Sequence, residues 1–165
     1  MTIMIRIKSF NLFGVNLGPF SAHDCPDVHF RPAVVDWVME GVALLLVVLG
    51  WVGVLWQYTT QGGQADGNMW VSALLSTLVF ALMVTGARLP VRFIRFPVRV
   101  NARNVGQQYV CVVRLLRAFN VCICLLFAVG PWTDHHLWAR IACLAALVLM
   151  ALSLAVYYVV ALRLK

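Results

Sequence analysis

The chain has 165 residues, of which 62% are hydrophobic and only 12% are charged, and its formal net charge is +7. A soluble domain of this size could not bury so much apolar surface. Composition therefore excludes a soluble globular protein and indicates an integral membrane protein.

The first 33 residues are the least regular part of the sequence. The segment from Met1 to Phe20 is moderately apolar, but basic residues interrupt it and Gly14, Gly18 and Pro19 break any helix. It lacks the uninterrupted apolar centre and the small-residue cleavage pattern of a signal peptide. We expect residues 1–33 to form a cytoplasmic arm that lies on the membrane surface or is partly disordered. An upstream start codon that adds residues without function is an alternative.

A short motif in this arm resembles a metal site only superficially. His23, Cys25, Asp27 and His29 alternate along the chain, which could point one set of side chains toward a metal ion. Pro26 interrupts the pattern, and no other ligand supports it. We therefore expect no metal site and no cofactor.

Four apolar segments are long enough to cross a bilayer, for which a helix needs about 20 residues. They are Val34 to Tyr58, Met69 to Ala87, Tyr109 to Val129 and Leu137 to Leu162. We expect an all-α, polytopic membrane protein in which residues 34–165 form one domain of four transmembrane helices.

The third segment is unusual because its uninterrupted apolar part, from Ala118 to Trp132, is too short to span the bilayer by itself. A spanning helix must begin near Tyr109, and it then carries Arg114 and Arg117 below the inner membrane surface. Buried cations of this kind need partners or a route back to water.

The positive charges predict the topology. The stretch from Arg88 to Arg117 holds seven arginines and no acid, and Arg163 and Lys165 follow the last span. The positive-inside rule places both regions in the cytoplasm. With four crossings, the N-terminus and the C-terminus are then both cytoplasmic.

A basic segment from Val91 to Arg103 precedes the third helix. Its arginines alternate with apolar residues at spacings of three and four, and Pro90 and Pro97 preclude one continuous helix. At an anionic inner leaflet each arginine could contribute about 1 kcal/mol. We therefore favour binding of lipid headgroups over recognition of nucleic acid or protein. The residues concerned are Arg92, Arg95, Arg99 and Arg103.

The first helix offers partners for the arginines of the third. Asp36 and Glu40 are spaced i, i+4 and share one helix face, as do Arg114 and Arg117 at i, i+3. Counted from the inner ends of the helices, Glu40 and Arg117 both lie roughly 10 Å deep. The favoured interpretation is an interhelical charge cluster that fixes the packing of these helices. The alternative is a proton or cation site at Glu40, which paired arginines disfavour because they stabilise the charged carboxylate.

The cysteines do not indicate a membrane thiol oxidoreductase, which needs paired thiols at the outer face. One cysteine is predicted to be cytoplasmic and four lie within helices, and no loop brings a nucleophile, a base and an orienting partner together. We therefore expect no enzymatic activity. The cysteines are Cys25, Cys111, Cys122, Cys124 and Cys143.

Small residues mark the packing surfaces of three helices, because they let another backbone approach closely. They serve either internal packing or a homodimer. The residues are Gly50 and Gly53 in the first helix, Ser72, Ala73, Ser76 and Thr77 in the second, and Ala142, Ala145, Ala146, Ala151 and Ala155 in the fourth.

A family resemblance is carried by three short motifs before and within the third helix. Phe96-Pro97-Val98 is followed by Asn104 with Gln108-Tyr109, and then by Arg114-Leu115-Leu116-Arg117. This order resembles small bacterial membrane proteins grouped as domain of unknown function 1648, distant relatives of the Sdp toxin-immunity protein. In that family a basic YPV segment leads into NxxxQY and RLLR, and the first helix likewise begins near an acid.

The resemblance covers roughly residues 28–130 and has one clear departure. Family members follow the first helix with a Pro-x-His-x-Asn segment and a Gly-x-x-Asp-Gly turn. Here only Gly63-Gln64-Ala65-Asp66-Gly67 remains, so the outer loop is degenerate. The resemblance implies the helical architecture and an immunity or signal-transduction role.

Together these features predict a non-enzymatic, multi-pass protein of a bacterial inner membrane that binds or regulates another membrane component. A polypeptide toxin, a transporter or a sensor protein would each be such a component. The expected partners are anionic lipids of the inner leaflet and a membrane protein or a second copy of the chain, without nucleic acid. The alternative is a small oligomeric, proton-coupled transporter that uses Glu40.

Overall fold

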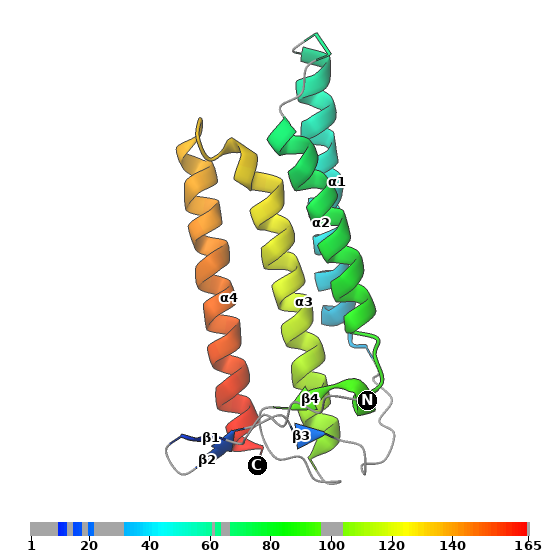
Figure 1. Cartoon of the computed structure of the whole chain (residues 1–165), viewed down its shortest axis with the longest axis vertical. Helices are drawn as coiled ribbons and strands as arrows, with labels where there is room; N and C mark the ends of the chain where they lie inside the picture. Colours follow the sequence, from blue (N-terminus) through cyan, green and yellow to red (C-terminus); the bar gives the residue numbers. More distant parts are fainter. Residues whose placement is uncertain are drawn as a thin grey trace, which may run out of the picture. The chain divides into compact units, whose positions relative to one another are not determined.

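The computed structural model is dominated by four long helices (Figure 1). They are α1 (Val34–Thr60), α2 (Gly67–Gly86), α3 (Val105–Val129) and α4 (Leu137–Arg163). The structure describes residues 10–12, 15–17, 20–21, 32–60, 62–63, 67–96 and 104–164. In these residues all four helices are long and apolar enough to cross a membrane, which confirms the prediction of an all-helical protein with four candidate spans.

The helix boundaries agree with the predicted ones except at the start of α3. This helix begins at Val105, one turn before the predicted start at Tyr109. The backbone carbonyl of Asn104 already accepts a hydrogen bond from the N–H of Gln108 at 3.1 Å. Hydropathy misses this turn because its glutamines are polar, whereas the helical backbone bonds do not depend on side-chain polarity.

The end of α1 is set by two glycines. Gly62 has a φ of 63°, and the N–H of Gly63 donates to the carbonyl of Tyr58 at 3.0 Å. A left-handed residue followed by this bond is the Schellman arrangement that ends many helices. Glycine adopts the conformation without a steric penalty.

Short strands, which the sequence analysis did not predict, lie outside the four helices. In the N-terminal arm, β1 (Phe10–Leu12) pairs antiparallel with β2 (Val15–Leu17). A second pair joins β3 (Phe20–Ser21) to β4 (Arg95–Phe96), which follows the 3-10 helix η1 (Val91–Phe93). Pairings of two or three residues are too short to leave a periodic pattern in the sequence, which is why they were not predicted. In residues 91–96, η1 and β4 agree with the prediction that no continuous helix follows Pro90.

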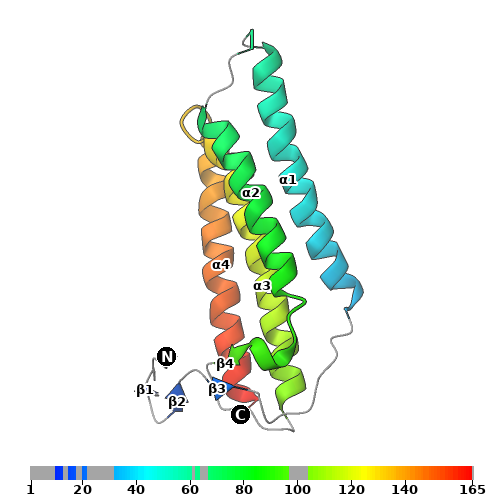
Figure 2. The same ribbon diagram turned by 45° about the vertical axis from the view of Figure 1, so that its right-hand side comes forward.

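The chain divides into two compact units, each described by itself. The terminal unit comprises residues 1–31, 89–112 and 156–165, and the helical unit comprises residues 32–88 and 113–155. In the helical unit α1 and α2 lie side by side (Figures 1 and 2). The 3-10 helix η2 (Gly130–Trp132) follows α3 in the same unit.

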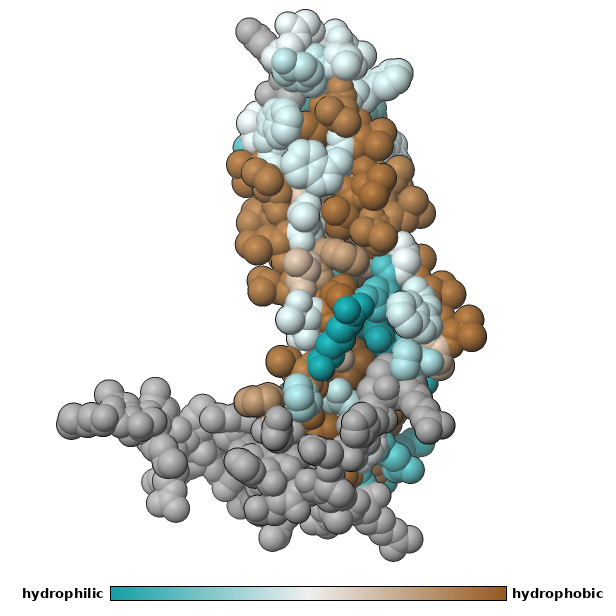
Figure 3. Space-filling model, turned by 90° about the vertical axis from the view of Figure 1, so that its right-hand side faces the viewer, coloured by the Kyte–Doolittle hydropathy of each residue, from teal (hydrophilic) through white to brown (hydrophobic). Residues whose placement is uncertain are grey.

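The core of the helical unit consists of two small apolar clusters. Ala43 and Val47 of α1 pack with Cys124 of α3 in the first cluster. Val54 of α1 packs with Met69 and Ala73 of α2 in the second. Most larger apolar side chains of α1, α2 and α4 are instead exposed. Figure 3 shows one such apolar face, which suits a hydrocarbon environment.

Candidate functional site

Asp36 occupies the first turn of α1 and is completely buried. Its Oδ2 atom accepts a hydrogen bond from the backbone N–H of Ala33 at 2.8 Å. An acid at the third helical position that reaches back to the residue before the helix forms half of a capping box. Asp36 therefore serves the start of α1, and its other oxygen remains available for a second partner.

That second partner is Arg117 of α3. The Nη1 atom of Arg117 lies 3.0 Å from Oδ1 of Asp36, and the side chain of Arg117 is only 10% exposed. Arg114 contacts the same oxygen from a longer distance, with its Nε at 3.7 Å and its side chain 54% exposed. The Asp36–Arg117 pair is thus the buried centre of the contact between α1 and α3.

Glu40 lies one turn further along α1 and contacts two arginines. Its Oε1 atom accepts a hydrogen bond from Nη2 of Arg88 at 3.1 Å. Its Oε2 atom lies 3.8 Å from Nη2 of Arg117. The sequence analysis assigns no partner role to Arg88. Its position could have indicated one, because Arg88 is the first cation after the second span and lies on the side of the membrane predicted for Glu40.

We call these five residues the charge cluster: Asp36, Glu40, Arg88, Arg114 and Arg117. The structure brings together all four side chains predicted from the sequence and adds Arg88. Both acids are engaged by guanidinium groups, and three arginines against two acids leave a formal charge of +1. In an apolar environment such pairing avoids the high cost of an isolated charge.

Ser72, Ala73 and Ser76 of α2 face the interior of the helical unit, whereas Thr77 is exposed. The hydroxyl of Ser72 donates to the carbonyl of Phe127 in α3 at 2.6 Å. The indole N–H of Trp51 in α1 donates to the hydroxyl of Thr77 at 2.9 Å. Ala73 and Ser76 are buried. This stripe therefore serves packing within the chain, with polar groups linking α2 to both neighbours.

The alanines of α4 differ in burial. Ala146 is fully buried and Ala142 is partly buried, whereas Ala145, Ala151 and Ala155 are exposed. In the most apolar 18-residue stretch of α4 only 11% is buried inside the chain, against 28% in the corresponding stretch of α3. Within the part of the chain that the structure describes, the exposed alanines therefore contribute little to internal packing.

Polar residues at the start of α3 bind backbone carbonyls in the terminal unit. The side-chain amide of Asn104 donates to the carbonyl of Leu164 at 3.1 Å, and that of Gln108 to the carbonyl of Ala161 at 2.9 Å. The hydroxyl of Tyr109 donates to the carbonyl of Leu89 at 2.9 Å. Ala161 lies in the last turn of α4, where carbonyls lack partners within the helix, and Leu164 directly follows the helix. The NxxxQY residues therefore have structural roles.

The proposed headgroup-binding arginines are placed only in part. Arg92 lies in η1 and Arg95 lies in β4, whereas Arg99 and Arg103 lie outside the described residues. The motif of His23, Cys25, Asp27 and His29 also lies outside them. Among the residues that the structure describes, no group of three or more histidines, cysteines or acids could hold a metal ion.

Comparisons with known proteins add no relative to this picture. No family model, no curated protein and no solved structure matched the chain. The resemblance to the family of domain of unknown function 1648 therefore remains a prediction. The functional argument depends on the geometry of the chain itself.

Proposed function

We propose that this chain is a non-enzymatic, multi-pass protein of a bacterial inner membrane that binds and thereby regulates another membrane component. The observation that carries the proposal is the exposed face of α4 that contains Ala151 and Ala155, which are spaced i, i+4. Small residues allow the backbone of another helix to approach closely, which is how helices associate in a bilayer. The partner is a helix of a second membrane protein or of a second copy of this chain.

The charge cluster supports a binding role over a catalytic one. Asp36 is buried and has a short ion pair with Arg117 as well as its hydrogen bond to the start of α1. A carboxylate held in this way fixes the relation of two helices. Its interactions leave it poorly placed to receive a substrate.

The proposal is tested by enlarging the exposed alanine face. In the double variant Ala151→Leu and Ala155→Leu, branched side chains replace the small ones and keep another helix at a distance. We expect native gel electrophoresis of gently solubilised membranes to show a complex with the unmodified chain and a smaller species with the variant. Ala81→Leu, on the exposed part of α2, is the matched control and should leave the complex intact. Migration of the unmodified chain as a monomer would contradict the proposal.

The proposal also covers lipid binding by the basic segment and the orientation of the two termini. Arg92, Arg95, Arg99 and Arg103 contact anionic headgroups of the inner leaflet, and both termini lie in the cytoplasm. The excess of arginine between the second and third spans supports this orientation. An immunity or signal-type role agrees with the family resemblance.

A second candidate is a small oligomeric, proton-coupled transporter that uses Glu40. Glu40 forms its shortest ion pair with Arg88, whose side chain is 67% exposed. This pair can open more easily than the buried Asp36–Arg117 pair, which favours the second candidate. Proton flux into liposomes that contain the unmodified chain or Glu40→Gln separates the two functions. For the binding role we expect no proton flux from either protein. Flux that is lost in Glu40→Gln at unchanged helicity would support transport.

A further inference from the structure

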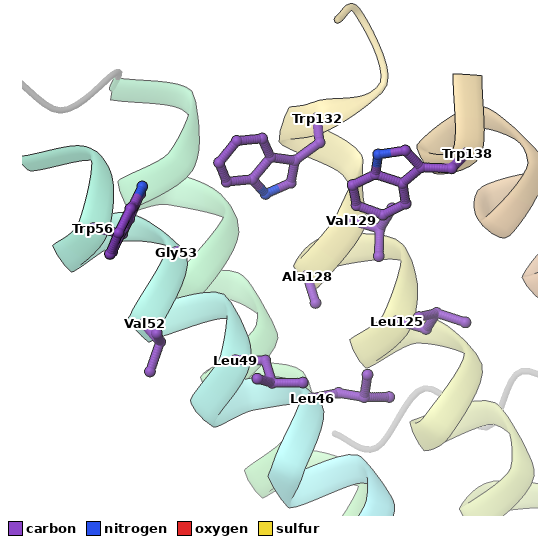
Figure 4. Close-up of a pocket in the computed structure, with 10 residues that line it drawn as sticks. All are labelled: Leu46, Leu49, Val52, Gly53, Trp56, Leu125, Ala128, Val129, Trp132 and Trp138. Atoms are coloured by element: carbon purple, nitrogen blue, oxygen red, sulfur yellow. The ribbon is translucent and has the colours of Figure 1, made fainter. Parts of the chain in front are cut away.

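An apolar pocket lies in the helical unit, away from the charge cluster. Its volume is about 470 Å³, and it is lined by ten residues from α1, α3, η2 and the start of α4 (Figure 4). Gly53 of α1 and Ala128 of α3 are its smallest lining residues, and a Cβ atom at Gly53 would lie 3.7 Å from the ring of Trp132. Leu46 and Leu49 project from α1 toward α3. All ten lining residues are apolar apart from the indole N–H groups of the tryptophans.

Tryptophans gather at one end of this pocket. Trp132 and Trp138 line it together with Trp56 of α1. The ring of His136 lies 5.8 Å from that of Trp138 and 6.1 Å from that of Trp132, which adds a further aromatic ring at this end. Tryptophan side chains prefer the level of the lipid headgroups. The tryptophan end thus lies near a membrane surface, and the pocket extends from there into the hydrocarbon.

Three properties of the pocket decide what it can hold. Its only polar groups are indole N–H donors at one end, which are too few to order water or to bind a polar solute along its length. Its volume is within the range of roughly 300–1,000 Å³ that is typical of small-molecule sites. Its ten lining residues fall well below the roughly 20–30 residues a side of a stable protein interface, which argues against a second copy.

We propose that the pocket binds one acyl chain of a membrane phospholipid whose headgroup lies at the tryptophan end. The acyl chain contacts the leucines of α1 and Ala128 of α3, and the indole N–H groups face the ester and headgroup region. Lipid tails already surround the helices, so specificity comes from close packing and not from removal of water. The inference depends on the membrane location of the helices and is independent of the proposed partner at α4.

Native mass spectrometry of the purified, detergent-solubilised chain with a defined phosphatidylglycerol tests the proposal. We expect one phospholipid to remain on each unmodified chain. In Leu49→Trp a larger ring occupies the pocket and removes packing contacts with the acyl chain. We therefore expect retention of the phospholipid to fall about tenfold. Leu44→Trp is the matched control, because Leu44 is exposed on the same helix but does not line the pocket. It should retain the lipid as the unmodified chain does.

Other outcomes overturn the proposal. Absence of retained phospholipid on the unmodified chain would refute it without any variant. Equal retention by Leu49→Trp and Leu44→Trp would place the lipid elsewhere, and loss of a dimer in Leu49→Trp would identify a second copy as the occupant. Circular dichroism monitors folding. If Leu49→Trp loses helicity, Ala128→Phe fills the pocket from α3 and must give the same tenfold loss.

Discussion

The buried ion pair between Asp36 and Arg117 gives the most direct test of how the helices are held together. We consider Asp36→Asn, because asparagine keeps an oxygen that can accept the hydrogen bond from Ala33 while it removes the charge. At an effective dielectric constant of about 20, unit charges 3.0 Å apart attract by roughly 5 kcal/mol. The variant also leaves the guanidinium of Arg117 buried without its closest counter-ion. We therefore expect a loss of about 3–5 kcal/mol in the free energy of unfolding.

Titration with a denaturing detergent, followed by circular dichroism, measures this loss. Arg114→Met is the matched comparison, because Arg114 contacts the same carboxylate from 3.7 Å with its side chain 54% exposed. We expect it to cost less than about 1 kcal/mol. The double variant Asp36→Asn and Arg117→Met removes both charges, so it should be more stable than the sum of the single losses implies. Additive losses, or equal costs for Asp36→Asn and Arg114→Met, would refute the claim that the pair is energetically coupled.

Three further predictions concern other parts of the chain. Gly62→Ala places a Cβ atom at a φ of 63°, so it should destabilise the chain by about 1 kcal/mol in the same titration, and Gly67→Ala, at the first residue of α2 where a Cβ atom meets open space, should not. Ser72→Ala removes the 2.6 Å hydrogen bond to the carbonyl of Phe127, so we expect a loss of about 0.6–1 kcal/mol, and an unchanged unfolding midpoint would disprove that the bond contributes. Replacement of the four arginines of the basic segment by glutamine should produce chains of mixed orientation, as read by a C-terminal reporter fusion; a uniform cytoplasmic C-terminus would contradict the role given to these charges in topology. The arginines replaced are Arg92, Arg95, Arg99 and Arg103.

The sequence predicted the helical architecture well because the length of an apolar segment is a local property. Three of the four spans were placed to within two residues of their observed ends. The start of α3 was one turn off because the polar residues before Tyr109 continue the helix. The short strands were missed because pairings of two or three residues are too short to leave a periodic signal in the sequence.

The charge cluster was predictable in part. Spacing places Asp36 and Glu40 on one face of α1, and a shared depth makes them candidates for the arginines of α3. Spacing and depth do not reveal which arginine lies closest to each acid. Arg117 lies close to the fully buried Asp36, whereas Glu40 forms its shortest ion pair with Arg88.

The sequence by itself determined that this chain has four apolar helices long enough to cross a membrane, since hydrophobic length and the distribution of charge are properties of the linear chain. Only the tertiary structure decided which alanines of α4 face inward, which arginine binds Glu40, and that a pocket exists beside Gly53 and Ala128. The physical reason is that the rotation of each helix about its axis follows from side-chain packing against its neighbours. Residues far apart in the chain supply that packing.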